Sequence, residues 1–117
     1  MNNSDIFTTV VGINNYEGNK VFKLGSIIKL LKEPENDYDA EAIACEIEYI
    51  GKVGYLANST KTVIKGTMSA GRVYDKIDNV SFCEVKFIAN NSVIAKVLTK
   101  NEIESLKNEN TDEFYHE

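Results

Sequence analysis

The chain has 117 residues, of which 43% are hydrophobic and 26% are charged, and its formal net charge is −5. This length fits one domain with its own buried core, and the composition is that of an ordinary globular protein. The negative charge argues against a protein that coats nucleic acid non-specifically, because that activity needs an excess of basic side chains.

The charge is unevenly distributed along the chain. Residues 101–117 hold six of the 18 acids and one of the 13 bases, so residues 1–100 are electrically neutral. Arg72 is the single arginine, and the other bases are lysines. Bidentate recognition of phosphate or guanine is therefore scarce, although lysines still act as point charges. A domain without net charge is better suited to holding the short end of a ligand than to covering a long, charged backbone.

The beginning of the chain and its two cysteines bear on the compartment. The first residues, MNNSDIF, have neither a basic start nor an apolar run, and no stretch approaches the roughly 20 apolar residues of a membrane span. Cys45 and Cys83 each lie inside an apolar strand pattern, which favours two buried free thiols over a disulfide. We expect a cytoplasmic protein without membrane contact, and the sequence predicts no oligomeric state.

Most of the chain alternates apolar and polar side chains with period two, which is typical of β-strands. The first strand is expected in FTTVVGI and is followed by a turn in NNYEGN. A second strand is expected in GSIIKLLKE. The strands AIACEIEYI and VGYLA, joined by a short return at Gly51-Lys52, predict a hairpin over residues 43–56.

A single helix is expected to interrupt the strands, at about residues 59–70. Asn58, Ser59 or Thr60 would cap its beginning, and Gly71 suits its C-terminal cap. The next two strands, SFCEVKFI and SVIAKVL, predict a hairpin across Asn90-Asn91.

The spacing Thr99-x-x-Glu102 is a capping box, which predicts a short terminal helix. We therefore expect one domain over residues 1–100, and a short helix with an acidic flexible tail over residues 101–117. The fold class is mainly β with two short helices, arranged as a small, partly open antiparallel barrel.

Catalytic and metal-binding patterns are scarce. The lone histidine, His116, is the penultimate residue, and neither cysteine has a histidine partner for a zinc site. No glycine-rich phosphate-binding loop precedes a helix. Five acids cluster in residues 33–41, but they lack the glycine and terminal glutamate of a calcium loop. We expect no enzyme, no cofactor and no metal.

The acidic cluster belongs to the bend EPENDYDAEAIAC, residues 33–45, which contains the only proline. Pro34 ends the preceding strand, and Asn36, Asp37 and Asp39 can each accept a backbone N–H two residues ahead. The bend is therefore expected to cap itself. Tyr38 leaves two alternatives open: its ring packs on the core, or a ligand base stacks on it.

The bend, followed by GKVGYL, resembles the signature of the HIRAN domain family. The segments VVGINNY and LGSIIKLLKE are similar to the first strands of that family, in the same order. The resemblance implies a modified OB-like β-barrel. It also implies a domain that is fused to chromatin-remodelling helicases or stands alone in bacteria. In the fused helicases the domain captures the 3′ end of single-stranded DNA.

The resemblance implies that Asn36, Tyr38 and Asp39 line the ligand pocket. The carboxylate of Asp39 would accept a hydrogen bond from a free 3′ hydroxyl and would repel a 3′ phosphate. Tyr38 would stack on the terminal base. An acidic group is then explicable in a DNA site, because it reads the end of the strand and not the backbone.

The sequence also departs from the family pattern. Asn14, Asn15 and Tyr16 stand where DNA-binding members carry basic and aromatic residues, and Ala57-Asn58-Ser59 stand where a lysine is frequent, so Lys52 or Lys61 would substitute for it. Phe82 is expected either to stack on a base or to pack under the terminal helix. The candidate nucleic-acid-binding residues are Asn14, Asn15, Tyr16, Asn36, Tyr38, Asp39, Lys52, Lys61 and Phe82.

Two functions follow as expectations. The first is a non-catalytic module that captures single-stranded DNA 3′ ends in bacterial DNA repair, replication or a mobile element, with a helicase or nuclease as partner. The alternative is a protein-interaction module on the same barrel, in which DNA binding is weakened or lost. The acidic tail favours this alternative, because such segments dock on basic partners or shield a DNA site.

Overall fold

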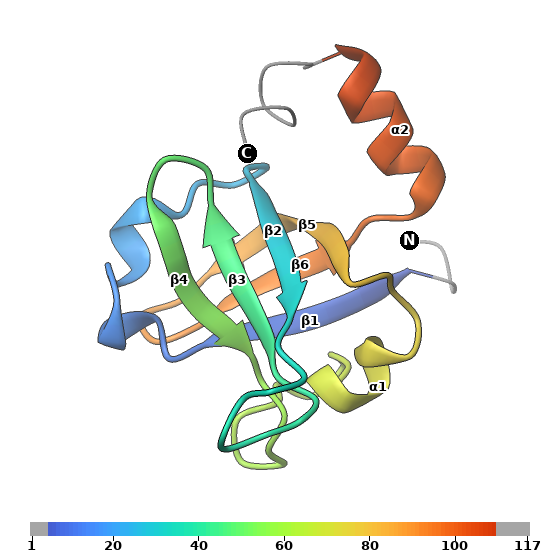
Figure 1. The fold of residues 1–117 in the computed structure, drawn as a ribbon. Helices are drawn as coiled ribbons and strands as arrows, with labels where there is room; N and C mark the ends of the chain where they lie inside the picture. Colours follow the sequence, from blue (N-terminus) through green and yellow to red (C-terminus); the bar gives the residue numbers. More distant parts are fainter. Residues whose placement is uncertain (1–4, 110–117) are drawn as a thin grey trace.

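A computed structural model describes residues 5–109 of the protein. Six strands form a closed antiparallel barrel in the order β1-β4-β3-β2-β5-β6 (Figure 1). The predicted mainly-β, OB-like antiparallel fold with two α-helices is confirmed, but the barrel is closed and not partly open. The strands are β1 (Ile6–Val11), β2 (Ile27–Lys32), β3 (Ile43–Ile47), β4 (Gly51–Leu56), β5 (Val80–Ile88) and β6 (Val93–Val97). The helices are η1 (Ile13–Asn15), η2 (Asn19–Val21), α1 (Ala70–Tyr74) and α2 (Lys100–Glu109).

The barrel closes through a short pairing between β1 and β4. This pairing joins Val10 to Leu56 and Val11 to Tyr55, whereas β1 pairs with β6 along nearly its whole length. Gly54 permits the approach, because a Cβ atom there would lie 2.7 Å from the carbonyl oxygen of Val11. The close packing of β1 against β4 thus explains why the second glycine of the GKVGYL motif, Gly54, carries no side chain.

The barrel interior is filled by the inward-facing side chains of all six strands. Cys45 and Cys83 are both fully buried there as free thiols, as the sequence predicts. Burial raises the pKa of each thiol above its ordinary value. Other buried core residues include Val10, Ile13, Ile28, Leu30, Ile43, Val53, Val73, Val85 and Val93.

Both predicted hairpins form, with one change of turn. The β5–β6 hairpin turns across Asn90-Asn91, where the N–H of Ala89 donates to the carbonyl of Ser92 at 2.9 Å. The β3–β4 hairpin turns at residues 48–50, before the expected Gly51-Lys52 return. Tyr49 there has a φ of 68°, in the left-handed region that few non-glycine residues adopt.

The expected helix at residues 59–70 is wrong: α1 begins only at Ala70, and Gly71 lies inside it. Residues 58–68 form turns and then an extended segment, in which Met68 lies beside Thr8 of β1 in a parallel bridge. The N–H of Met68 donates to the carbonyl of Phe7 at 2.7 Å, so β1 takes a backbone donor that a helix would use. Gly66 has a φ of 94°, which also ends any helix before it.

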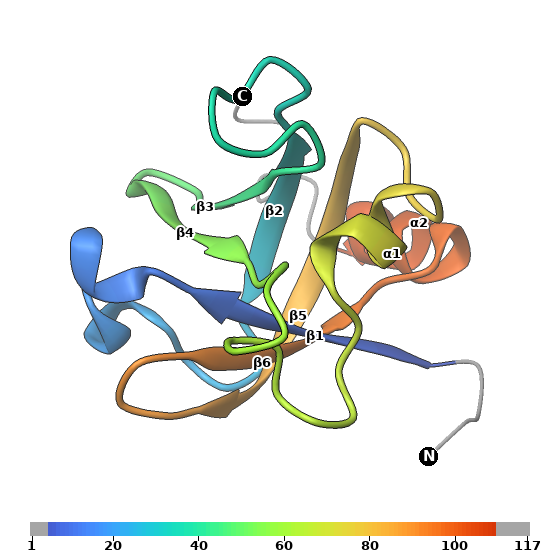
Figure 2. The same ribbon diagram turned by 90° about the horizontal axis from the view of Figure 1, so that it is seen from below.

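The terminal helix α2 confirms the predicted capping box. The N–H of Glu102 donates to the hydroxyl of Thr99 at 3.1 Å, and the N–H of Thr99 donates to the carboxylate of Glu102 at 2.9 Å. Lys96 of β6 forms an ion pair with the same carboxylate, which ties α2 to the barrel. Figure 2 shows the chain leaving β6 and leading into α2. The tail beyond residue 109, with His116, lies outside the described residues. No helix within residues 5–109 is long and apolar enough to cross a bilayer.

Candidate nucleic-acid interface

The bend at residues 33–42 caps itself through two side chains. The side-chain oxygen of Asn36 accepts the backbone N–H groups of Tyr38 at 2.8 Å and Asp39 at 3.1 Å. Asp39 Oδ1 accepts the N–H of Glu41 at 2.9 Å. The prediction of a self-capped bend is thereby confirmed for Asn36 and Asp39, and the local bonds fix the backbone on both sides of Tyr38.

Tyr38 lies at the tip of this bend, and its side chain is not part of the core. It is 98% exposed, more than any other large hydrophobic residue described. The core-packing alternative is therefore excluded. A fully exposed aromatic ring offers a flat face on which a base can stack.

A second set of contacts ties the bend to the outer face of β4. Lys52 Nζ donates to Glu33 Oε2 at 2.9 Å and to the Tyr55 hydroxyl at 2.7 Å, and that hydroxyl donates to Glu33 Oε1 at 2.8 Å. Asn36 Nδ2 donates to the same Glu33 Oε1 at 3.0 Å. A shallow cavity of about 370 Å³ adjoins this network, lined by Lys32, Glu33, Pro34, Glu35 and Asn36.

The electrostatics of the network follow from these hydrogen bonds. Burial alone would raise the pKa of Glu33, but hydrogen bonds from Lys52, Asn36 and Tyr55 outweigh it and hold the pKa below its ordinary value. Hydrogen bonds with Tyr55 and Glu33 raise the pKa of Lys52 above its ordinary value. Lys52 is therefore a charged, internally paired lysine, and a phosphate at this point must compete with Glu33.

Asn58 holds the other side of the bend. Its Nδ2 donates to Asp39 Oδ2 at 2.8 Å, and its Oδ1 accepts the N–H of Gly71 in α1 at 2.8 Å. From the sequence, this asparagine was interpreted as a candidate helix cap and as a departure from a frequent lysine, and it was not linked to the bend. No local pattern signals its contact, because Asp39 and Asn58 are 19 residues apart in the chain.

The remaining candidate residues lie around the barrel at different distances from the bend. Asn14 and Asn15 belong to η1 after β1, where Asn14 donates to the side chain of Asn91 at 2.8 Å. Tyr16, directly after η1, is 40% exposed. Lys61 is exposed in the segment that follows Asn58.

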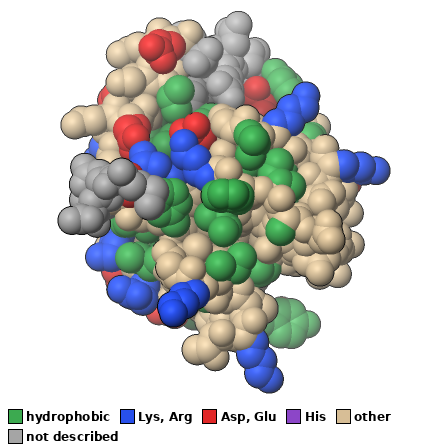
Figure 3. Space-filling model, turned by 180° about the vertical axis from the view of Figure 1, so that it is seen from behind, with side chains coloured by type: hydrophobic (Ala, Val, Ile, Leu, Met, Phe, Trp, Pro, Cys, Tyr) green, Lys and Arg blue, Asp and Glu red, His purple; other side chains and the backbone are tan. Residues whose placement is uncertain are grey.

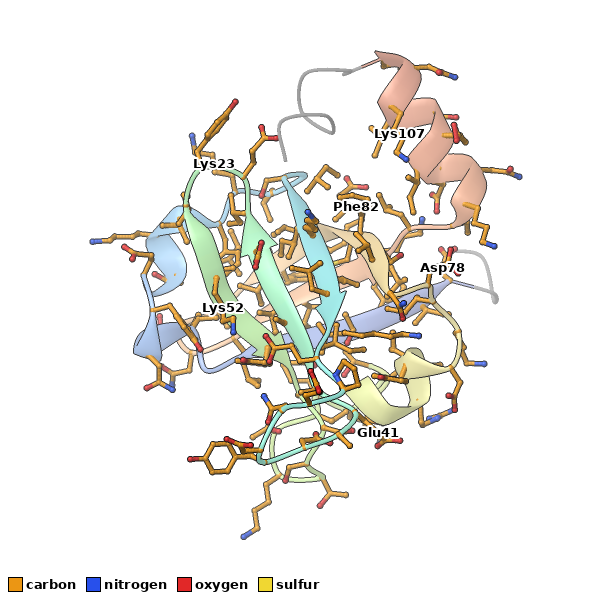
Figure 4. The ribbon with its side chains drawn as sticks, in the orientation of Figure 1. Lys23, Glu41, Lys52, Asp78, Phe82 and Lys107 are labelled. Atoms are coloured by element: carbon orange, nitrogen blue, oxygen red, sulfur yellow. The ribbon has the colours of Figure 1, made fainter. Side chains whose placement is uncertain are left out.

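Phe82 lies on the outer face of β5, opposite Lys29 of β2, and is half-buried. Figure 4 shows Phe82 on the side of the barrel that α2 occupies, and Glu41 near α1 at the other end. The structure therefore brings together Asn36, Tyr38 and Asp39 and links them to Lys52 through Glu33. Phe82 lies apart from this group.

The acidic bend forms no recognisable metal centre. Within residues 5–109, no group of three or more His, Cys, Asp or Glu side chains is placed to hold a metal ion. Two of the clustered carboxylates, those of Glu33 and Asp39, accept hydrogen bonds from protein donors instead.

A larger concave surface lies on the face seen in Figure 3, where apolar side chains gather between basic ones. Its cavity has a volume of about 690 Å³, and exposed Phe87 belongs to it. Sequence reasoning missed this groove, because its residues come from separate strands. Its lining consists of Asp5, Phe7, Lys65, Gly66, Thr67, Glu84, Lys86, Phe87, Ile94, Lys96 and Glu102.

Comparisons with known proteins agree with the barrel fold. The crystal structure of the HIRAN domain of human HLTF is similar, with a TM-score of 0.56 and 19% sequence identity, over 95% of this chain and 89% of that chain. A search of curated proteins gave no significant match. The family model of the HIRAN domain matches residues 3–100. The chain therefore belongs to the HIRAN domain family.

Proposed function

We propose that this protein is a non-catalytic module that binds the 3′ end of single-stranded DNA. Membership of the HIRAN family supports nucleic-acid binding at the level of the family. The observation that carries the proposal is that one bend holds, at consecutive positions, a fully exposed ring, Tyr38, and a carboxylate fixed by hydrogen bonds, Asp39. A nucleotide end offers a base for the ring and a hydroxyl for the carboxylate.

The hydrogen-bonding capacity of Asp39 fits this role. A carboxylate accepts about four hydrogen bonds, and each oxygen of Asp39 accepts one from the protein, from Glu41 and from Asn58. Each oxygen therefore retains capacity for a ligand hydroxyl. A 3′ phosphate would bring like charges together, so the site should discriminate against it.

The charge around the bend predicts modest affinity. Glu35, Asp37 and Glu41 are exposed acids near Asp39, and one of the two predicted cations, Lys52, is paired with Glu33. Attraction of the phosphate backbone is therefore weak. Stacking on Tyr38, worth about 1–3 kcal/mol per base, and the hydroxyl contact would supply most of the binding energy.

A titration of short 5′-labelled oligonucleotides with 3′-hydroxyl or 3′-phosphate ends tests the proposal. The wild type should prefer the hydroxyl, Asp39→Ala should lose that preference, and Tyr38→Ala should weaken binding to both ends. Asp37→Ala is a matched control, because it removes a neighbouring exposed acid. Equal affinity for both ends, or no binding at low salt, would exclude end capture.

The wider context is also proposed. We place the module in bacterial DNA repair, replication or a mobile element, with a helicase or nuclease acting on the captured strand. Production of the protein with candidate helicases and nucleases, followed by cleavage or unwinding assays on 3′-tailed DNA, tests this context. Unchanged rates with and without the module would count against it.

A protein-interaction module is the second candidate, and the apolar groove favours it. Phe87 there is 69% exposed, which is unusual for a phenylalanine without a partner surface. Phe87→Asp should abolish partner binding and leave the 3′-end preference intact if the groove serves a protein. Loss of DNA binding in the same variant would instead assign the groove to the DNA strand.

A further inference from the structure

The backbone immediately before Asn58 is held in place by hydrogen bonds of Ala57. The N–H of Ala57 donates to the carbonyl of Thr9 in β1 at 2.7 Å, and the carbonyl of Ala57 accepts the N–H of Ala70 in α1 at 2.8 Å. Ala57 itself is buried. The backbone before Asn58 is therefore tied to the barrel and to α1, although the asparagine side chain lies at the surface.

The two ends of the Asn58 amide have different partners. Nδ2 faces the carboxylate of Asp39, and Oδ1 faces the backbone N–H of Gly71, each at 2.8 Å. Only this orientation satisfies both, because a carboxylate needs a donor and a backbone N–H needs an acceptor. The Gly71 contact thus determines which end of the amide Asp39 meets.

This arrangement fixes the plane of the Asp39 carboxylate. Glu41 N–H holds Oδ1 from within the bend, and Asn58 holds Oδ2 from a different segment. Without Asn58, the carboxylate would be held by its own bend alone and could rotate about its side-chain bonds. The unused lone pairs of the Asp39 carboxylate would then no longer point in one fixed direction.

We infer that Asn58 is a positioning residue that orients Asp39 toward the 3′ hydroxyl of a bound DNA strand. The inference rests on the proposed function. Asn58 acts through Asp39 and supplies no charge to a phosphate. It should therefore alter the discrimination between a hydroxyl and a phosphate end, and leave general attraction of the strand unchanged.

The test compares Asn58→Ala and Asn58→Asp with the wild type, by fluorescence anisotropy on 3′-hydroxyl and 3′-phosphate oligonucleotides. Asn58→Ala should reduce the preference for the hydroxyl about three- to tenfold, the effect of one hydrogen bond, with unchanged affinity for the phosphate end. Asn58→Asp should reduce the preference at least as much, because it removes the donor and places a second carboxylate beside Asp39.

Asn19→Ala is the matched control, because Asn19 donates its amide to the carbonyl of Ala89 at 3.1 Å on a different part of the surface. It should retain the full preference. An Asn58→Ala protein with the wild-type preference, or with equal loss of both affinities, would overturn the inference and leave the proposed function standing. A wild type without any preference would overturn both.

Discussion

Glu33 and Lys52, from the bend and from β4, form an ion pair of 2.9 Å at a half-buried surface. The pair removes a cation from the candidate DNA site and, through Asn36, fixes the backbone beside Tyr38. The ion pair therefore stabilises the geometry of the site, and it also neutralises a positive charge that could otherwise bind phosphate.

The pair should make stability depend on pH. The folded pKa of Glu33 lies below its ordinary value of 4.5, so its contribution is present above that value and is lost as pH falls through the folded pKa. Lys52→Met should cost about 1 kcal/mol at neutral pH and flatten the dependence below pH 4.5. Urea unfolding across pH measures both effects.

Lys20→Met is the control for the Lys52 substitution, because Lys20 is exposed in η2. It should leave the free energy of unfolding nearly unchanged. Superimposed pH profiles for wild type and Lys52→Met would show that the ion pair contributes nothing to stability.

Gly54 should be essential for closure of the barrel. A Cβ atom at this position would lie 2.7 Å from a backbone oxygen of β1, which cannot move without breaking the β1–β4 pairing. Gly54→Ala should therefore cost at least about 2–3 kcal/mol in the free energy of unfolding. Thermal or urea denaturation measures the loss.

Gly51→Ala separates crowding from backbone strain. Gly51 has a φ of 96° and no heavy atom within 4 Å of an added Cβ, so only strain is expected, about 1 kcal/mol. If Gly54→Ala were no more destabilising than Gly51→Ala, the close approach would not control barrel closure.

DNA binding should depend only weakly on salt. Each phosphate contact with a single strand contributes a slope of about −0.7 to log K against log salt, and we expect no more than about two contacts. Lys61→Gln should reduce the slope by about 0.7, the value of one contact. Lys100→Gln should leave it unchanged, because Lys100 lies at the start of α2, near Asp78. A much steeper slope would mean that the backbone, not the end, is recognised.

The attachment of α2 should loosen in acid. Hydrogen bonds from Lys96 and from the backbone of Thr99 hold the pKa of Glu102 below its ordinary value of 4.5, so its stabilising effect is lost as pH falls through the folded pKa. Thr99→Ala should cost about 1 kcal/mol of helix stability. Hydrogen exchange at the N–H of Ile103, which donates to the carbonyl of Thr99, reports the loss.

Ser105→Ala, on an exposed position of the same helix, is the control and should not accelerate exchange at Ile103. Exchange that is equally slow in Thr99→Ala and wild type would mean that the capping box does not maintain the first turn.

The sequence predicted those features that depend on neighbouring residues. The capping box of Thr99 and Glu102, the turn at Asn90-Asn91 and the caps by Asn36 and Asp39 join residues close in the chain. Their geometry follows from side-chain chemistry and spacing, so they were identified correctly. The family signature likewise lies in two short segments that are close in the chain, the bend and GKVGYL.

The tertiary structure decided whatever depends on residues far apart in the chain. The segment after Asn58 is not helical, because β1 takes its backbone donor at Met68. The partners of Lys52 and Asp39 are each 19 residues away in the chain, and only the folding of the chain brings them together. The exposure of Tyr38 could not be predicted from the sequence either. A ring in a polar bend can point toward the core or toward solvent, and the packing of the whole barrel decides between the two.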